Sequence, residues 1–201
     1  MLGLPQSTEV KRPLPKTQLY KRFDWKPSQR ESFDRDVSRL DFVNWIAPNT
    51  LPAIAEGVEI KEIFVIEVIL KSRDFDTKNI LLLAKSIPQR IIYLLHYEEE
   101  YCLAIYHTKL FLSGWQSGTL DSSLLALKGL NLDVVWQNIV AFVGNVEVAH
   151  GNSLSEQIRI DEERAKLIRQ IESLERQMRS TSQPRRKRQI YLEIKKLKQQ
   201  L

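Results

Sequence analysis

At 201 residues and 43% hydrophobic content, the chain is long enough for one cored domain with an appendage and too apolar to be disordered throughout. Its single cysteine excludes a disulfide framework and a cysteine-based zinc site, and no run of about 18 apolar residues is present to span a membrane. The net charge of +5 comes from the last quarter, because residues 151–201 hold 13 Lys or Arg against 7 Asp or Glu. With an apolar start too short for a secretion signal, these features predict a cytoplasmic protein with one basic interaction arm.

Residues 1–30 are predicted to form an extended N-terminal strap. Four prolines interrupt any long helix in this stretch, since each removes a backbone donor and restricts the residue before it. The apolar side chains of TQLYKRFDW indicate a short helix over about 16–23 that holds the strap against the rest of the chain.

Residues 31–150 are predicted to form an α+β domain, in which helices pack on a small mixed or antiparallel sheet. Helices are expected over about 28–38 with Ser28 and Glu31 as a capping box, after Asp76 or Thr77, and from Asn131 or Asp133 to Gly144. Strands are expected over 40–47, 58–71, 90–97 and 100–107, with a short edge strand in KLFLSGW. The strand over 58–71 is apolar on both faces in its second half, which is typical of a central strand.

Residues 151–201 are predicted to form a basic C-terminal helical hairpin or coiled coil, with helices over about 154–179 and 185–201. The second helix is too short to be stable alone, so the first helix, the α+β domain or another subunit must cover its apolar side. The apolar seams predicted for the two helices are Ile160, Leu167, Ile171, Leu174 and Met178, then Ile190, Ile194, Leu197 and Leu201.

The basic residues of this tail are the clearest candidates for a binding site. Phosphate contacts from such groups give salt-sensitive affinity that is largely independent of sequence. A solvated helix surface is the alternative, but it does not explain four cations at a helix start, where the helix dipole disfavours positive charge. We therefore expect nucleic-acid or partner binding by Arg179, Arg185, Arg186, Lys187, Arg188, Lys195, Lys196 and Lys198.

Five segments, MLGLPQSTEV, IAPNTL, EIFVIEVILK, IPQRIIYLL and LKGLNLDVVWQNIV, resemble an uncharacterised prokaryotic family, the domain of unknown function 4391. The resemblance runs in order from Met1 to about Gly144 and says little about the basic tail. It implies a setting beside helicases and DNA methyltransferases in restriction or phage-defence loci. No catalytic residue can be carried over, because the family has none established.

A metal-dependent nuclease is the enzyme alternative. Such nucleases place an acid on one strand, then an acid and a lysine two residues apart on the next, so that both face one metal and one water. Glu59 and Lys61 have this spacing, Asp41 lies upstream, and Glu67 and Lys71 follow on the same predicted strand. The alternative for Glu59 and Lys61 is a solvated strand end.

Several other polar residues are interpreted structurally. A charge at Glu67, within FVIEVIL, needs a partner such as Arg90, Tyr93 or a helix terminus if it is buried. Cys102 is interpreted as a small core residue. No Gly-rich phosphate loop is present, so no nucleotide or other cofactor is predicted. No metal site is predicted either, because the histidines lack metal-ligand spacing: His96, His107 and His150.

These features favour a non-enzymatic accessory subunit of a DNA-handling complex. It would dock on a larger helicase- or methyltransferase-type protein, which the family resemblance implies, and would contact DNA or that partner through the basic tail. The alternatives are the metal-dependent nuclease and a self-assembling coiled-coil scaffold, a homo-oligomer formed through the C-terminal helices.

Overall fold

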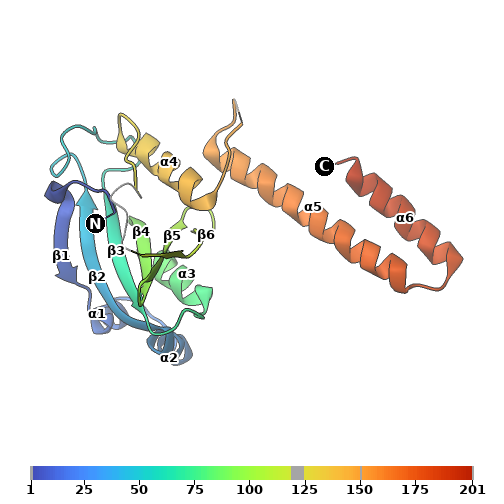
Figure 1. Ribbon diagram of the computed structural model, residues 1–201, viewed down its shortest axis with the longest axis horizontal. Coiled ribbons are helices and arrows are strands. Elements are labelled where there is room, and N and C mark those ends of the chain that lie inside the picture. Colours follow the sequence, from blue (N-terminus) through green and yellow to red (C-terminus); the bar gives the residue numbers. More distant parts are fainter. Residues whose placement is uncertain (1, 119–124, 150, 201) are drawn as a thin grey trace. The chain divides into compact units, whose positions relative to one another are not determined.

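The computed structural model describes residues 2–118, 125–149 and 151–200, and the chain divides into two compact units. Unit 1 is Met1–Val146 and unit 2 is Glu147–Leu201. Figure 1 labels their helices and strands. Unit 1 contains η1 (Gln6–Thr8), β1 (Glu9–Pro13), α1 (Lys16–Arg22), α2 (Pro27–Asp36), β2 (Val37–Ile46), β3 (Ile63–Leu70), α3 (Thr77–Ser86), β4 (Arg90–Tyr97), β5 (Glu100–Tyr106), β6 (Leu110–Leu112), β7 (Gln116–Ser117) and α4 (Leu132–Gly144). Unit 2 contains α5 (Leu154–Ser180) and α6 (Pro184–Lys198).

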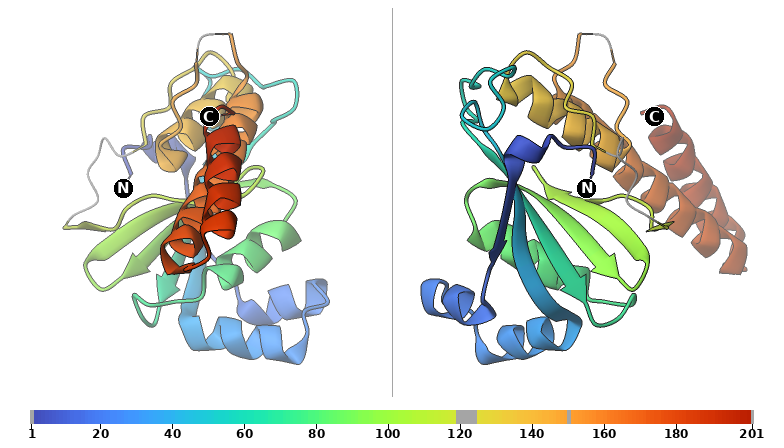
Figure 2. Two further views of the ribbon diagram at one scale, coloured as in Figure 1. Left: turned by 90° about the vertical axis from the view of Figure 1, so that its right-hand side faces the viewer. Right: turned by 60° about the vertical axis from the view of Figure 1, so that its left-hand side comes forward.

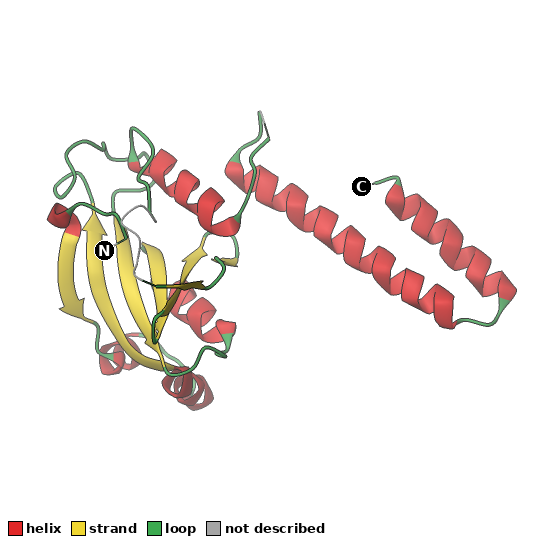
Figure 3. Ribbon diagram, in the orientation of Figure 1, coloured by secondary structure: helices red, strands yellow, loops and turns green. Residues whose placement is uncertain are grey.

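The sheet of unit 1 is mixed, so the predicted α+β class is confirmed. Its strands follow the order β1-β2-β3-β4-β5-β6, and β7 pairs with the first two residues of β5, Glu100 and Tyr101. All described pairs are antiparallel except β3 and β4, which are parallel. Parallel neighbours need a crossover connection, and α3 supplies it. In Figure 3 the strands form one curved layer with the helices of unit 1 around it.

Strand β3 is central, as its apolar sequence predicts, but it is shorter than predicted. It begins at Ile63 rather than at residue 58. The preceding backbone turns instead, with the Gly57 N–H donating to the Ile60 carbonyl over 2.9 Å. Glu59 and Lys61 therefore lie outside the strand, and the i, i+2 spacing does not place them on one face.

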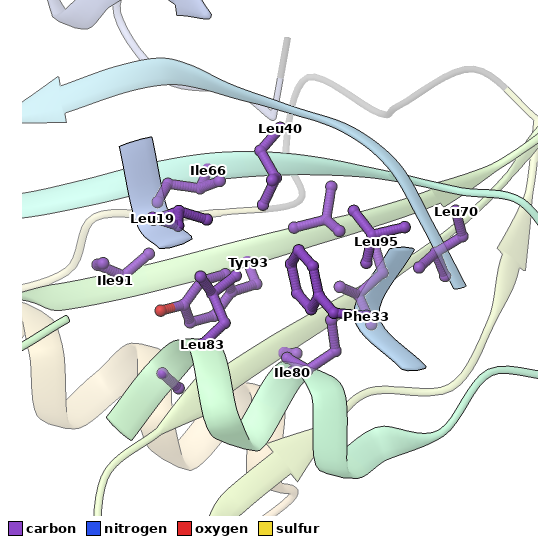
Figure 4. Close-up of a cluster of buried hydrophobic side chains, with 14 of the residues drawn as sticks. Leu19, Phe33, Leu40, Ile66, Leu70, Ile80, Leu83, Ile91, Tyr93 and Leu95 are labelled. Atoms are coloured by element: carbon purple, nitrogen blue, oxygen red, sulfur yellow. The ribbon is translucent and has the colours of Figure 1, made fainter. Parts of the chain in front are cut away.

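One face of the sheet carries a core cluster formed with α1, α2 and α3. Alternate residues of β3, Ile66, Val68 and Leu70, point into it, as the period of two in a strand requires. The Phe33 ring of α2 is fully buried and meets the Trp25 ring edge-on at 5.1 Å. Figure 4 shows how leucine and isoleucine side chains from strands and helices surround Phe33 and Tyr93. Cys102 belongs to this cluster, which confirms its interpretation as a core residue.

The opposite face is covered at one end by α4, which packs on β5 and β6. Figure 2 shows α4 at the end of the sheet that lies away from α2. Gly144 rests against the Phe111 ring of β6, where a Cβ atom would overlap the ring. The apolar stripe predicted for this helix is buried, including Trp136 and Ile139. Asn131 is its N-cap, since the side chain accepts a hydrogen bond from the Val134 N–H.

The first residues of the chain contain a strand that the proline pattern concealed. Strand β1 pairs with β2 at the edge of the sheet, where Pro13 is tolerated because the outer side needs no donors. Buried Thr8 is fixed there by a 2.8 Å hydrogen bond from the Asn44 amide. The helix predicted over 16–23 is confirmed as α1.

The capping prediction for α2 is wrong. The helix begins one residue earlier, at Pro27, because proline suits the first helical position. The Gln29 side chain then accepts a hydrogen bond from the Lys26 N–H over 2.8 Å, so Ser28 and Glu31 are not the cap pair. For α3 the prediction holds, and Asp76 accepts from the Lys78 N–H.

Unit 2 is built from two helices that share a small apolar cluster. Its buried members are Ile171 of α5 with Ile190 and Ile194 of α6, and Leu174, Met178 and Leu197 pack against them. Ile160, a predicted seam residue, is 38% exposed, and Leu201 lies outside the described residues. Within the described ranges, no helix of either unit is both long and apolar enough to cross a membrane.

Candidate functional site

The basic residues of α6 lie in its first turn and along one of its sides. Pro184 is the first helical residue and Gln183 the N-cap, so Arg185, Arg186 and Lys187 occupy the positive end of the helix dipole. The first turn has no acidic residue. Local helix energetics therefore disfavour this cluster, and its position is not explained by helix stability.

All eight cations predicted as a binding site are exposed to solvent. Lys198 forms an ion pair, with its Nζ atom 2.9 Å from Glu175 Oε1. That hydrogen bond, followed by the charge of Lys198, lowers the pKa of Glu175 below its ordinary value. Within the part of the chain that the structure describes, the other seven make no ion pair: Arg179, Arg185, Arg186, Lys187, Arg188, Lys195 and Lys196.

The charge of the tail is concentrated more sharply than the boundary at residue 151 suggests. Residues 176–201 contain nine Lys or Arg and a single anion, Glu193. Residues 151–175 contain four cations and six anions, so the first part of α5 has no positive excess. The apolar cluster around Ile190 and Ile194 holds one side of α6 against α5. The positive surface is therefore made by the end of α5 and the rest of α6.

The nuclease candidates Glu59 and Lys61 lie in the loop before β3. Lys61 is used locally, since its Nζ atom donates to the Gly57 carbonyl over 2.8 Å and lies 3.2 Å from Glu56 Oε2. Lys71 follows the end of β3 and donates to the Asp34 carbonyl over 2.7 Å. These two lysines thus lie at opposite ends of β3, and each donates to a backbone carbonyl.

Asp41 and Glu67 are the two candidates that the fold brings together. They are direct partners in the register of β2 and β3. Asp41 Oδ2 lies 2.6 Å from Arg39 Nε, an ion pair without the angles of a hydrogen bond. Glu67 Oε1 lies 3.0 Å from His96 Nδ1 on β4. Glu67 therefore has a partner, as expected, but the predicted partners Arg90 and Tyr93 are wrong.

The described residues hold no metal-like cluster, since no three of their His, Cys, Asp and Glu side chains are placed to share an ion. His96 pairs across the sheet with Tyr101, whereas His107 lies beyond Ile105 at the far end of β5. His107 accepts a 3.3 Å hydrogen bond from the buried Trp136 indole, and burial, with the charge of Arg90, lowers its pKa. His150 lies outside the described residues.

A carboxylate clasp at Asp133 was not predicted. Asp133, in the first turn of α4, accepts backbone hydrogen bonds from Val58 at 2.6 Å, Ile60 at 2.8 Å and Glu59 at 3.3 Å. Desolvation raises the pKa of Asp133, but these three bonds and the charge of Lys61 outweigh it, so the pKa is lowered. Gly57 is required here, because a Cβ atom would overlap the carboxylate. An acid in a helix first turn was visible in the sequence, but its distant backbone partners were not.

A second feature that was not predicted is an aromatic surface made by Phe42 and Trp45 of β2 and Phe64 of β3. Phe42 and Phe64 pack against the core cluster. All three side chains are half-buried. Phe42 and Trp45 are three residues apart on β2, which would normally place them on opposite faces. A register shift between Phe42 and Asn44 puts them on the same face. The strand was predictable from its residues, but the bulge that brings these rings together was not.

Comparison with known proteins gives one match. A search of the curated proteins found no matching protein, and a search of the solved structures found none either. The family model described as "Domain of unknown function (DUF4391)" matches residues 2–201. The match includes the basic tail, which the resemblance read from the sequence left out. The chain therefore belongs to the DUF4391 family.

Proposed function

We propose that α5 and α6 act as one basic helical hairpin that binds the sugar-phosphate backbone of nucleic acid, in a protein that serves as a non-enzymatic accessory subunit. The observation that carries this proposal is the set of seven exposed cations, at the end of α5 and on α6, that make no ion pair with any residue the structure describes. Phosphate is the ligand that such a set suits, because guanidinium and ammonium groups bind its oxygens through charge-assisted hydrogen bonds.

The spacing on α6 supports a backbone-tracking contact. With about 100° of rotation per residue, Arg185, Arg188, Lys195 and Lys196 project away from the side that holds Ile190 and Ile194. The rise from Arg185 to Lys196 is about 17 Å at the usual rise per residue. Duplex DNA carries about one charge per 1.7 Å of axis, so this length faces several phosphates.

The expected binding is sensitive to salt and tolerant of sequence. Phosphate contacts position a protein on nucleic acid but carry no base information. Tyr191 is the one aromatic side chain of α6, so this helix has little capacity for base stacking. A larger DNA-handling partner remains part of the proposal, since the family resemblance implies one.

The test is a triple charge reversal, Arg185→Glu, Arg186→Glu and Arg188→Glu, in the full-length chain. Affinity for a duplex oligonucleotide is measured by fluorescence anisotropy over a range of salt concentrations. We expect binding to weaken at least tenfold and the slope of log affinity against log salt to fall by about 0.9 for each phosphate that the variant no longer neutralises.

The matched control is Arg164→Glu, Lys166→Glu and Arg169→Glu. It changes the net charge by the same amount on exposed residues of α5 that lie before the basic surface. The control is expected to keep most of the affinity. Equal weakening in both variants would mean that only total charge matters, and unchanged binding in the first would refute the proposal.

A further inference from the structure

The aromatic surface on β2 and β3 adjoins two cavities on unit 1. Phe42 meets the Phe64 ring edge-on at 5.9 Å, and Trp45 lies parallel to Phe64 at 6.5 Å with an interplanar angle of 8°. A cavity of about 450 Å³ extends from these rings toward β1, and one of about 280 Å³ extends toward α1 and the start of β4. The two cavities share Leu14, Gln18, Phe42 and Phe64, so they adjoin one another, and together they are called the groove.

Positive charge lies on the walls of this groove. Arg12 of β1 lines the larger cavity and Arg22 of α1 lines the smaller one, and both are exposed. The Arg22 guanidinium lies 5.9 Å from the Phe23 ring centroid. Among the described residues, the one carboxylate that lines the groove is Glu62, whose Oε2 atom accepts a 2.9 Å hydrogen bond from the Trp45 indole N–H.

The Glu62 bond has two consequences for a ligand. It satisfies the polar atom of Trp45 and fixes the orientation of the indole, so the ring is a preformed stacking surface. It also leaves the second oxygen of Glu62, together with the Gln18 amide, as hydrogen-bonding groups beside the rings. The groove thus presents flat apolar rings, polar groups that can bind the edge of a flat ligand, and two guanidiniums.

We propose that this groove binds an unpaired nucleotide of a single-stranded nucleic acid. The base stacks on the Phe42, Trp45 and Phe64 surface, and Arg12 and Arg22 bind the flanking phosphates. Aromatic stacking combined with a cationic wall is the general chemistry of single-strand binding, and arginine adds cation–π contact. A base within a duplex cannot enter, because its faces are already covered by its neighbours. The groove belongs to unit 1, so this proposal stands independently of the one for α6.

Intrinsic tryptophan fluorescence gives a readout confined to unit 1, because all four tryptophans of the chain lie there, at positions 25, 45, 115 and 136. The full-length protein is titrated with a short oligo-dT and with a duplex of the same length. We expect saturable quenching by the oligo-dT and none by the duplex. Quenching that is equal for both probes would overturn the proposal.

Two kinds of variant assign the site. Arg12→Ala with Arg22→Ala is expected to weaken oligo-dT binding about tenfold, because two phosphate-binding groups are removed. Lys21→Ala with Lys26→Ala removes the same charge from exposed residues that do not line the groove, and is expected to bind normally. Equal affinity of the arginine variant and the natural chain would refute the role of the groove.

The Trp45 variants separate stacking from folding. Trp45→Phe keeps a flat ring, so it should retain the affinity, measured by anisotropy of a labelled oligo-dT, while losing the fluorescence quenching. Trp45→Ala should lose about tenfold in affinity. Quenching that persists in Trp45→Phe would place the ligand at another tryptophan. Oligo-dT binding that vanishes only in the α6 charge-reversal variant, with no quenching in the natural chain, would overturn the groove and leave the proposal for α6 intact.

Discussion

Unit 1 and unit 2 are stabilised in different ways. Unit 1 has a sheet with side chains buried on both faces, and large residues such as Phe33, Tyr93 and Trp136 are at most 1% exposed. The shared cluster of α5 and α6 contains three buried isoleucines, Ile171, Ile190 and Ile194. The first is a layered core, in which each element is fixed by several neighbours. The second is a single seam between two helices.

The two units also differ in how their charged side chains are bonded. In unit 1 charged side chains are used for structure: Asp36, Asp133 and Lys16 each bind backbone or buried groups. On α6, most of the cations have no carboxylate partner in the described residues. Several charged side chains of unit 1 therefore serve the fold, whereas most cations of α6 have no such role among the described residues. Three experiments test how far this difference extends.

The largest expected effect is in the core of unit 1. Phe33→Ala removes a fully buried ring that packs against Trp25, so we expect a loss of about 3–5 kcal/mol in the free energy of unfolding. Urea unfolding followed by tryptophan fluorescence measures it. Phe142→Ala is the matched control, since that side chain is 57% exposed, and it should change stability by less than about 0.5 kcal/mol. Similar losses in both variants would mean that unit 1 lacks the packing described.

The next effect concerns a buried carboxylate and depends on pH. Asp36 accepts hydrogen bonds from the Asp76 N–H at 2.8 Å and the Asn79 amide at 2.7 Å. Burial raises the pKa of Asp36, but these bonds and Arg35 outweigh it and hold the pKa below its ordinary value of 3.8. Because the folded-state pKa is lowered, the stabilisation is present above pH 3.8 and is lost as pH falls through the folded-state value.

Asp36→Asn should therefore cost about 1–3 kcal/mol at pH 7, and the difference from the natural chain should shrink in acid. Urea midpoints measured at pH 7 and near pH 3 give the comparison. Asp24→Asn, at an exposed aspartate, should match the natural chain at both pH values. A difference that stays constant with pH would show that the charge of Asp36 does not contribute.

The most local of the three effects is in unit 2. Ile194→Ala weakens the seam by about 2 kcal/mol, so the amides of α6 should exchange with solvent more than tenfold faster. Tryptophan-detected unfolding of unit 1 should not change. Leu192→Ala, at a residue that is 56% exposed, is the control and should leave exchange unchanged. If Ile194→Ala also lowered the stability of unit 1, the two units would not be independent in energy.

Much of unit 1 was predictable because its signals are local. Strands β4 and β5 have the predicted bounds to within one residue, and α3 and α4 begin at the predicted caps Asp76 and Asn131. In each case a capping side chain or an alternating apolar pattern within a few residues predicts the helix or the strand. Strand β1 was not predicted, because the prolines around it interrupt the alternating pattern of a strand. The segment is a strand because it pairs with β2.

The candidate sites also differ in whether they depend on residues that are close in sequence or on distant ones. The positive surface of α6 was predictable because like charges close in sequence stay close in a helix. The acid and lysine of the nuclease pattern were not brought together, since Glu59 and Lys61 lie outside the strand on which the pattern depends. The partner of Glu67 is His96, which is 29 residues away and becomes a neighbour only through the parallel pairing of β3 and β4.

The sequence by itself determined most of the helices and strands and where positive charge accumulates, because both follow from residues within a turn or a short run of one another. Tertiary structure decided where β3 begins, which groups Asp133 and Glu67 bind, and that Phe42, Trp45 and Phe64 form one surface. Those features depend on strand register, a bulge and contacts between distant segments. Such contacts are selected by the packing of the whole unit, which no short stretch of sequence specifies.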